Sequence, residues 1–144
     1  MTPKHHIVFL TGAGISQESG ISTFRDANGL WNNHKLEEVA SPEGFEKNPQ
    51  LVLDFYNARR RQLDEVNPNE AHHLIAQLET KYNVTIITQN IDDLHERAGS
   101  TNVLHLHGEL RKCRSSKNPN LIYDCNQDIK LGDLASDGNQ LRPH

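Results

Sequence analysis

The strongest constraint on this chain is a short apolar run that leads directly into two closely spaced glycines. Residues 5–10 read HHIVFL and end in four successive apolar residues, which is typical of a strand buried on both faces of a parallel sheet. Gly12 and Gly14 permit positive φ and let bare backbone N–H groups approach an anion, at which a following helix would direct its positive end. The run therefore predicts an α/β fold whose first turn binds the diphosphate of a dinucleotide.

The two glycines alone leave a second interpretation open. The dinucleotide fingerprint G-x-G-x-x-G has a third glycine, but Gln17 stands at that place. An ordinary strand-to-helix turn that needs glycine for steric reasons has the same pattern. The longer string from Thr11 to Trp31, TGAGISQESGISTFRDANGLW, carries many more positions on which the two interpretations can be compared.

This string resembles the NAD-binding signature of the sirtuins, which are NAD-dependent protein-lysine deacylases. The sirtuin pattern reads GAG-x-S-x-x-SGI-x-x-FR, and it is matched here by Gly12, Ala13, Gly14, Ser16, Ser19, Gly20, Ile21, Phe24 and Arg25. The resemblance implies an α/β, Rossmann-like parallel sheet and NAD as the cofactor. It implies these cofactor-binding residues in the first block: Gly12, Ala13, Gly14, Ile15, Ser19, Gly20, Phe24, Arg25 and Trp31.

A second block follows the next predicted strand, residues 84–88. Gln89, Asn90, Ile91 and Asp92 come directly after it, at the carboxyl end where ligands bind in open α/β sheets. Asp92 also fits a simple N-cap of a helix over residues 93–98. The string TQNID is sirtuin-like, and the resemblance implies that these four residues line the nicotinamide and its ribose, with Asn90 and Asp92 contributing to catalysis.

A third block, VLHLHG, covers residues 103–108 and predicts another strand. By alternation, His105 and His107 point to the same face of it. Either histidine, taken alone, fits a hydrogen-bonded structural role. The sirtuin resemblance implies that His107 is the general base, since an imidazole accepts a proton near neutral pH, while His105 stays structural.

The predicted helix over residues 48–66 carries a clue to the substrate. Tyr56 and Arg59 are three residues apart and therefore share a face, where a phenol and a guanidinium suit a carboxylate. A core aromatic residue beside a solvated charge would show the same spacing. FYNARR resembles the Tyr-x-x-Arg acyl-pocket motif of class III sirtuins, which implies that succinyl, malonyl and similar groups are removed from lysine, with acetyl-lysine as a second substrate.

The chain departs from the family pattern after the third block. Many sirtuins hold a structural zinc with two CxxC pairs, whereas this chain has only Cys113 and Cys125. We therefore expect no metal and a small insert without zinc.

The resemblance also implies a domain layout. Residues 1–109 are the N-terminal part of an NAD-binding Rossmann-like domain with a helical insert at about residues 35–66. Residues 110–140 are the small-domain insert, and residues 141–144 begin the return to the main sheet. The match covers about three fifths of the usual sirtuin core, so we expect these 144 residues alone to lack full activity.

Composition limits the other possibilities. A net charge of −4 argues against a nucleic-acid binder, and no apolar run reaches the length of a membrane span. The N-terminus lacks the pattern of a signal peptide, and two unpaired cysteines fit a reducing cytoplasm. We expect a cytoplasmic monomer, and the sirtuin resemblance implies that its partners are acylated lysine side chains of proteins.

The sirtuin resemblance implies an NAD-dependent deacylase that yields nicotinamide, O-acyl-ADP-ribose and free lysine. Two alternatives stay open from the residues. An NAD glycohydrolase or ADP-ribosyltransferase would keep His107 or Asn90 without an acyl-lysine channel. A non-catalytic NAD-sensing module would need only the glycine turn.

Overall fold

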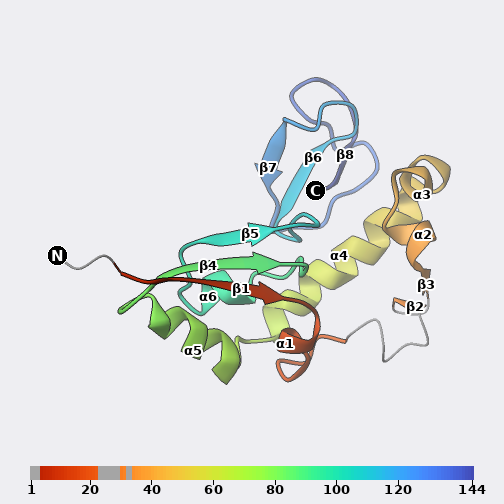
Figure 1. Ribbon diagram of the computed structural model, residues 1–144. Coiled ribbons are helices and arrows are strands. Elements are labelled where there is room, and N and C mark those ends of the chain that lie inside the picture. Colours follow the sequence, from red (N-terminus) through yellow and green to blue (C-terminus); the bar gives the residue numbers. More distant parts are fainter. Residues whose placement is uncertain (1–3, 23–29, 32–33) are drawn as a thin grey trace. The chain divides into compact units, whose positions relative to one another are not determined.

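The computed structural model describes residues 4–22, 30–31 and 34–144, with only the backbone described at residues 30 and 31 (Figure 1). The chain divides into two compact units. Unit 1 comprises Met1–Ser22 and Val66–Gly108, and unit 2 comprises Thr23–Glu65 and Glu109–His144. No helix in the described part of the chain is both long enough and apolar enough to cross a membrane.

Unit 1 is built on a parallel sheet of three strands in the order β1-β4-β5. These strands are β1 (His6–Thr11), β4 (Asn83–Thr88) and β5 (Val103–His105). The register places Thr11 opposite Thr88 and Thr88 opposite His105, so the three strands end at one edge. The helices of this unit are α1 (Gly14–Gln17), α5 (Glu70–Leu78) and α6 (Leu94–Arg97). The predicted Rossmann-like α/β fold is confirmed.

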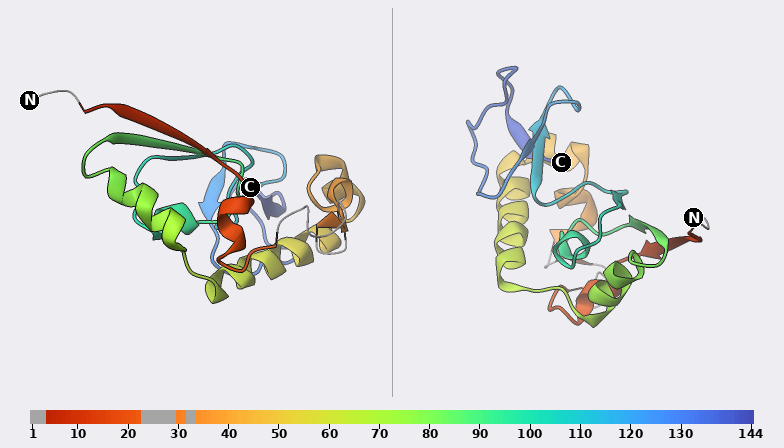
Figure 2. Two further views of the ribbon diagram at one scale, coloured as in Figure 1. Left: turned by 60° about the horizontal axis from the view of Figure 1, so that its bottom comes forward. Right: turned by 90° about the vertical axis from the view of Figure 1, so that its left-hand side faces the viewer.

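Helix α5 packs on one face of this sheet (Figure 2). Ile75 of α5 forms a buried cluster with Val84 and Ile86 of β4, and Phe9 of β1 packs against it. The apolar stripe of α5 explains this packing, since apolar residues three and four apart lie on one side of a helix.

The opposite face of the sheet is open among the described residues of unit 1. Val8 and Leu10 of β1 are 55% and 68% exposed, and Leu104 and Leu106 are also exposed. The prediction that the first strand is buried on both faces is therefore wrong for the described structure. The apolar run does form a strand, as predicted, but helices of this unit cover only one face of β1.

Unit 2 contains the helices α2 (Leu36–Val39), α3 (Pro42–Lys47) and α4 (Pro49–Glu65), and the short antiparallel pair β2 (Leu30–Trp31) and β3 (His34–Lys35). Its second sheet is antiparallel, in the order β7-β6-β8, with β6 (Lys112–Ser115), β7 (Ile122–Asp124) and β8 (Leu141–Pro143). One buried apolar cluster of unit 2 contains Phe45, Val52, Leu53, Cys113, Cys125 and Ile129.

A buried arginine ties α4 to the segment after the third sequence block. Arg60 is 1% exposed, and its Nε donates to the carbonyl of Leu110 at 2.8 Å. Its Nη1 donates to Asn57 Oδ1 at 2.8 Å, and Asn57 Nδ2 donates to the carbonyl of Ile129 at 2.8 Å. Backbone and side-chain oxygens thus accept from Nε and Nη1 of a cation that would otherwise be costly to bury, while Nη2 has no partner among the described residues.

The last residues of the given sequence add a strand to unit 2. Leu141–Pro143 form β8, antiparallel to β6. The open edge of β6 offers backbone groups with which this segment pairs, so the local sheet takes it.

Candidate functional site

The candidate site of unit 1 lies where its three parallel strands end. The glycine turn follows β1, the segment Gln89–Asp92 follows β4, and His107 follows β5. Because the strands are parallel, their carboxyl ends meet at one edge of the sheet, as expected for a ligand site in an open α/β fold.

The glycine turn differs in detail from its prediction. Gly12 and Gly14 have ordinary negative φ, whereas Gly20, at φ 100°, requires the left-handed region that glycine tolerates. A Cβ at Gly14 would meet no heavy atom within 4 Å, and one at Gly12 would meet only the end of the Gln89 side chain, at 3.8 Å. Glycine therefore leaves bare backbone here rather than permitting an unusual turn.

A buried hydrogen-bond network joins the first and second sequence blocks. Ser16 Oγ donates to Asp92 Oδ2 at 2.9 Å, and Asn90 Nδ2 donates to Ser16 Oγ at 3.1 Å. All three side chains are buried, at 0%, 6% and 8% exposure for Ser16, Asp92 and Asn90. Ser16 matched the sequence signature, but its place at the centre of this network was not predicted.

Asp92 lies one residue before the start of α6. Its Oδ1 accepts the backbone N–H of Leu94, the first residue of α6, at 3.2 Å. The N-cap of α6 is Asp93, so the prediction of Asp92 as the N-cap is wrong by one residue. Burial raises the pKa of Asp92, and the hydrogen bonds from Ser16 and from the Leu94 backbone act against that rise. The carboxyl is therefore held in place at both oxygens.

The two histidines of the third block bond to the segment after β4. His107 Nδ1 donates to the carbonyl of Gln89 at 3.1 Å, and His107 itself is exposed. In the neutral ring this leaves the lone pair of Nε2 as an acceptor. His105 Nδ1 donates to the carbonyl of Asn90 at 2.7 Å, and its Nε2 lies 2.8 Å from Glu96 Oε1. Both His105 nitrogens therefore face oxygen atoms of neighbouring residues.

Asn69 holds the loop after β1, a role that the sequence did not predict beyond a helix cap. Its Oδ1 accepts the Ala71 N–H at 3.0 Å, which caps α5. Its Nδ2 donates to the carbonyl of Ile15 at 2.7 Å and to Ser19 Oγ at 2.9 Å. One side chain therefore fixes both the start of α5 and the segment that contains the Ser-Gly-Ile match.

Two buried histidines lie beneath this loop. His72 and His95 are 0% and 1% exposed, and their ring centroids are 4.9 Å apart in an edge-to-face arrangement. Burial, with His95 and His73 nearby, lowers the pKa of His72 to about 4. Burial also lowers the pKa of His95, whose Nε2 lies 3.0 Å from Oγ1 of Thr11, the last residue of β1. Both rings are therefore neutral near pH 7.

The predicted acyl pocket belongs to unit 2. Burial raises the pKa of Tyr56 to about 12, with the positive charge of Arg142 opposing the rise. Arg59 is three residues along α4, and its guanidinium carbon lies 6.0 Å from the centre of the Phe55 ring. Among the described residues, Arg59 Nε and Nη1 are buried without a hydrogen-bond partner, and burial lowers the pKa of this side chain.

Three predicted cofactor residues cannot be placed. Phe24 and Arg25 lie outside the described residues, and so does the side chain of Trp31. Ala13 and Ile15 follow β1 in the glycine turn and α1, and Ile91 lies between Asn90 and Asp92.

The described residues include no cluster of three or more His, Cys, Asp or Glu side chains that could hold a metal ion. Cys113 and Cys125 are buried free thiols in the core of unit 2. Burial, together with the neighbouring Cys125, raises the pKa of Cys113 to about 12, so this thiol stays protonated.

The fold and the polar residues at the strand ends define a Rossmann-like protein with a nucleotide-type site. The family model described as the Sir2 family matches residues 12–136, and the chain belongs to that family. The predicted relationship to the sirtuins is confirmed.

The relatives carry a consistent description. The chain is 66% identical over 138 residues to the NAD-dependent protein deacylase of Helicobacter pylori (strain ATCC 700392 / 26695), a match that covers 96% of this chain and 60% of that relative. Among solved structures, a Sir2 homolog–NAD complex is 44% identical with a TM-score of 0.82, covering 99% of this chain and 56% of its own. A Sir2 complex with 2′-O-acetyl-ADP-ribose and a deacetylated peptide is 33% identical with a TM-score of 0.72. This match covers 96% of the present chain and 56% of the chain in that complex. The chain thus spans about 60% of the length of that Helicobacter relative.

Proposed function

We propose that this protein removes acyl groups from protein lysine side chains in an NAD-dependent reaction. The observation that carries the proposal is the buried Ser16–Asn90–Asp92 network, which holds polar side chains of two sequence blocks at the strand ends beside His107. Relatives that are named NAD-dependent protein deacylases, and a Sir2 structure that contains NAD, support the same activity.

The residues at the strand ends suit NAD. The bare backbone at Gly12 and Gly14 would face the diphosphate, because a side chain there would occupy the space that an anion needs. Gln89, Asn90, Ile91 and Asp92 would hold the nicotinamide end, together with Phe24, Arg25 and Trp31. When bound, NAD supplies the ribose carbon to which the acyl group is carried as nicotinamide leaves.

His107 is the proposed general base. Its Nδ1–H is committed to the carbonyl of Gln89, which leaves Nε2 to accept a proton from a ribose hydroxyl. Asn90 and Asp92 would position the ribose or a water beside it. His105 has both nitrogens occupied and is therefore a supporting residue. The proposed products are nicotinamide, O-acyl-ADP-ribose and free lysine.

The proposed acyl preference is for succinyl and malonyl groups, with acetyl-lysine as a further substrate. Arg59 supports it, since two of its buried donor atoms lack partners among the described residues and a carboxylate would satisfy them. Tyr56 keeps its proton, because its pKa of about 12 makes the hydroxyl a donor at every physiological pH. The two groups together would bind an acyl carboxylate.

The proposed setting follows from the same residues. Two buried free thiols fit a reducing compartment, so we place the protein in the cytoplasm as a monomer. Its proposed partners are acylated proteins, with neither nucleic acid nor membrane as a partner, given the net charge of −4.

Incubation of the full-length protein with NAD and a succinyl-lysine peptide tests this function. Mass spectrometry should detect the deacylated peptide, together with nicotinamide and O-succinyl-ADP-ribose in equal amounts. Release of nicotinamide without deacylation would instead show a glycohydrolase, or a transferase if ADP-ribose appears on protein. NAD binding without any product would leave only an NAD-sensing role.

A further inference from the structure

Unit 2 contains a pair of guanidinium groups that the proposed mechanism does not use. Arg114 of β6 and Arg142 of β8 lie directly opposite each other on adjacent antiparallel strands. Like charges in this arrangement repel each other. The Nε atoms of both arginines are buried, and neither has a hydrogen-bond partner among the residues that the structure describes. An anion in the same space would offset this repulsion and would accept from the unpartnered donors.

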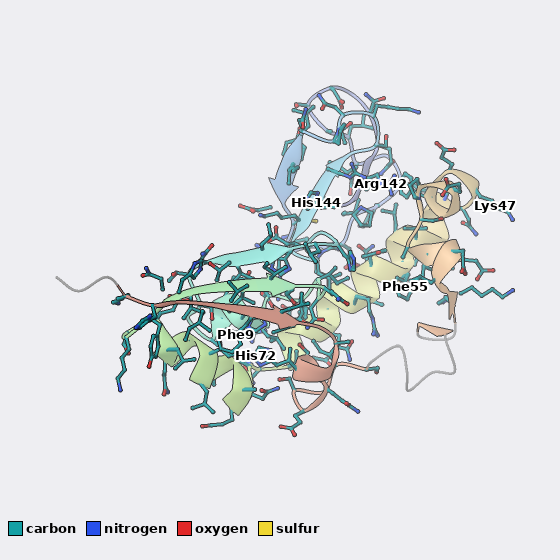
Figure 3. The ribbon with its side chains drawn as sticks, in the orientation of Figure 1. Phe9, Lys47, Phe55, His72, Arg142 and His144 are labelled. Carbon is teal, nitrogen blue, oxygen red and sulfur yellow. The ribbon has the colours of Figure 1, made fainter. Side chains whose placement is uncertain are left out.

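Arg142 lies beside the core on which Tyr56 packs. Its guanidinium carbon is 4.7 Å from the centre of the Phe45 ring. Phe45 belongs to the buried cluster of unit 2, and Tyr56 packs against that same cluster. Strand β8 is also in contact with helix α4, which carries Tyr56 and Arg59. Figure 3 labels Arg142 and Phe55, the neighbour of Tyr56 in α4, among the side chains of this unit.

The charges around Arg142 do not balance. Burial and then the neighbouring Arg114 lower the pKa of Arg142, whereas Tyr56 and Glu46 act in the opposite direction. Glu46 is exposed, and no carboxylate of the described residues lies within 4 Å of either guanidinium. A positive charge therefore remains on the side of Arg142 that interacts with the Tyr56 phenol.

Neighbouring arginines of the same unit show the contrast. Arg61 forms an ion pair with Asp128, and Arg111 forms one with Asp64 at 2.7 Å. Arg61 and Arg111 thus have carboxylate partners, and the buried Arg60 has carbonyl oxygens as partners. For the Nε atoms of Arg59, Arg114 and Arg142 the described residues offer neither kind of partner.

We propose that Arg142 is a specificity-determining residue, which binds the terminal carboxylate of an acidic acyl group together with Tyr56 and Arg59. This inference rests on the proposed function, and it adds a third residue to the proposed carboxylate site of Tyr56 and Arg59. Arg114 raises the positive potential from the opposite strand. The planar guanidinium of Arg142 offers donors in a fork that matches both oxygens of a carboxylate.

The alternative is that Arg142 only packs on Phe45. A packing role would affect all substrates alike, because loss of the stacked side chain would loosen the core of unit 2 irrespective of the acyl group. A carboxylate-binding role would affect succinyl-lysine and spare acetyl-lysine. The ratio of the two activities separates the roles.

The test compares the full-length wild type with Arg142→Met, Arg142→Lys and Arg61→Met. Met keeps an apolar stem without charge, Lys keeps the charge without the fork, and Arg61→Met removes an arginine that is already paired. With succinyl-lysine and acetyl-lysine peptides of one sequence, we expect Arg142→Met to lower the ratio of kcat/KM values by about tenfold or more, the usual loss of a charged hydrogen bond. Arg142→Lys should fall between that variant and the wild type, and Arg61→Met should match the wild type.

A second readout uses free succinate as the probe and does not depend on desuccinylation. Succinate should inhibit deacetylation by the wild type more strongly than by Arg142→Lys. Equal losses of desuccinylation and deacetylation in the Arg142 variants would overturn the role of Arg142. Succinate inhibition of Arg142→Lys as strong as that of the wild type would also overturn it. In both cases, desuccinylation by the wild type would still support the proposed function. A wild type that deacetylates without desuccinylating would overturn both. If Arg142→Met does not fold, Arg142→Lys alone tests the proposal, through its ratio of kcat/KM values for the two peptides and through its inhibition by succinate.

Discussion

Ser16 and Asp92, which are 76 positions apart in the chain, share a buried hydrogen bond of 2.9 Å at the edge of the parallel sheet. Asp92 is acidic and buried, and the bond from Ser16 is the largest influence that offsets the rise of its pKa on burial. Ser16 of α1, just after the glycine turn, therefore attaches this part of the chain to the segment after β4. Any change in that serine should reach both halves of the proposed NAD site.

Replacement of this serine gives the first prediction. Ser16→Ala removes the donor to Asp92 Oδ2 and the acceptor for Asn90 Nδ2, which leaves two buried polar groups without this partner. We expect the free energy of unfolding to fall by about 1–3 kcal/mol, the usual cost of such a loss. Urea unfolding measures it.

Ser22→Ala is the matched control, because Ser22 is exposed in the same unit. The control should stay within about 0.5 kcal/mol of the wild type, as surface substitutions usually do. If Ser16→Ala were equally stable, the network would hold neither block in place.

The proposed base gives the second prediction. His107→Tyr should reduce kcat by about 100-fold or more, since general base catalysis contributes at least that much in most enzymes. The melting temperature should change little, because His107 is exposed and makes one hydrogen bond through its ring.

His73→Tyr, at an exposed position of α5, is the control for that substitution and should keep wild-type turnover. Retained turnover in His107→Tyr, with O-acyl-ADP-ribose still formed, would remove His107 from the mechanism.

Buried His72 gives a prediction about pH. Its folded-state pKa of about 4 lies below the unfolded value of 6.5, so the unfolded chain binds the proton more readily between these values. Stability is therefore full above pH 6.5 and is lost as the pH falls toward 4. We expect a loss of about 2–3 kcal/mol from this ring over that range.

Urea unfolding from pH 4 to pH 7.5 measures this slope. His72→Phe removes the titrating ring, and its slope over this range should be clearly shallower than that of the wild type. His5→Phe, at an exposed position of the same unit, should keep the wild-type slope. Equal slopes in all three proteins would show that His72 does not carry the pH dependence.

The sequence predicted the elements of unit 1 because their causes are local. The apolar run 84–88 indicated a strand with polar residues at its end, and the structure has β4 there, followed by the hydrogen-bond network of Asn90 and Asp92. The same local reasoning failed for β1, where Val8 and Leu10 are exposed, because an apolar run does not tell how many layers cover it.

Contacts between distant segments were beyond local patterns. Asn69 was expected to cap a helix, and its second role on Ile15 and Ser19 depends on where the first loop lies in space. The pairing of β8 with β6 could not be predicted either, because the sequence of residues 141–143 does not indicate which strand they pair with.

The acyl pocket gives the last prediction. Tyr56→Phe combined with Arg59→Met removes one hydroxyl and one guanidinium from α4 while keeping an aromatic ring and a stem of similar length. The core packing of Tyr56 should survive, since its ring rather than its hydroxyl packs against the cluster around Phe45. An acyl carboxylate would lose both partners, whereas an acetyl group has no carboxylate to lose. We expect kcat/KM for a succinyl-lysine peptide to fall by about 100-fold, with KM rising, and that for an acetyl-lysine peptide to change by less than about threefold.

Arg61→Met, whose arginine is exposed and paired with Asp128, should change neither value. Equal losses on both peptides in the double variant would show that α4 supports the fold of unit 2 and does not select the acyl group.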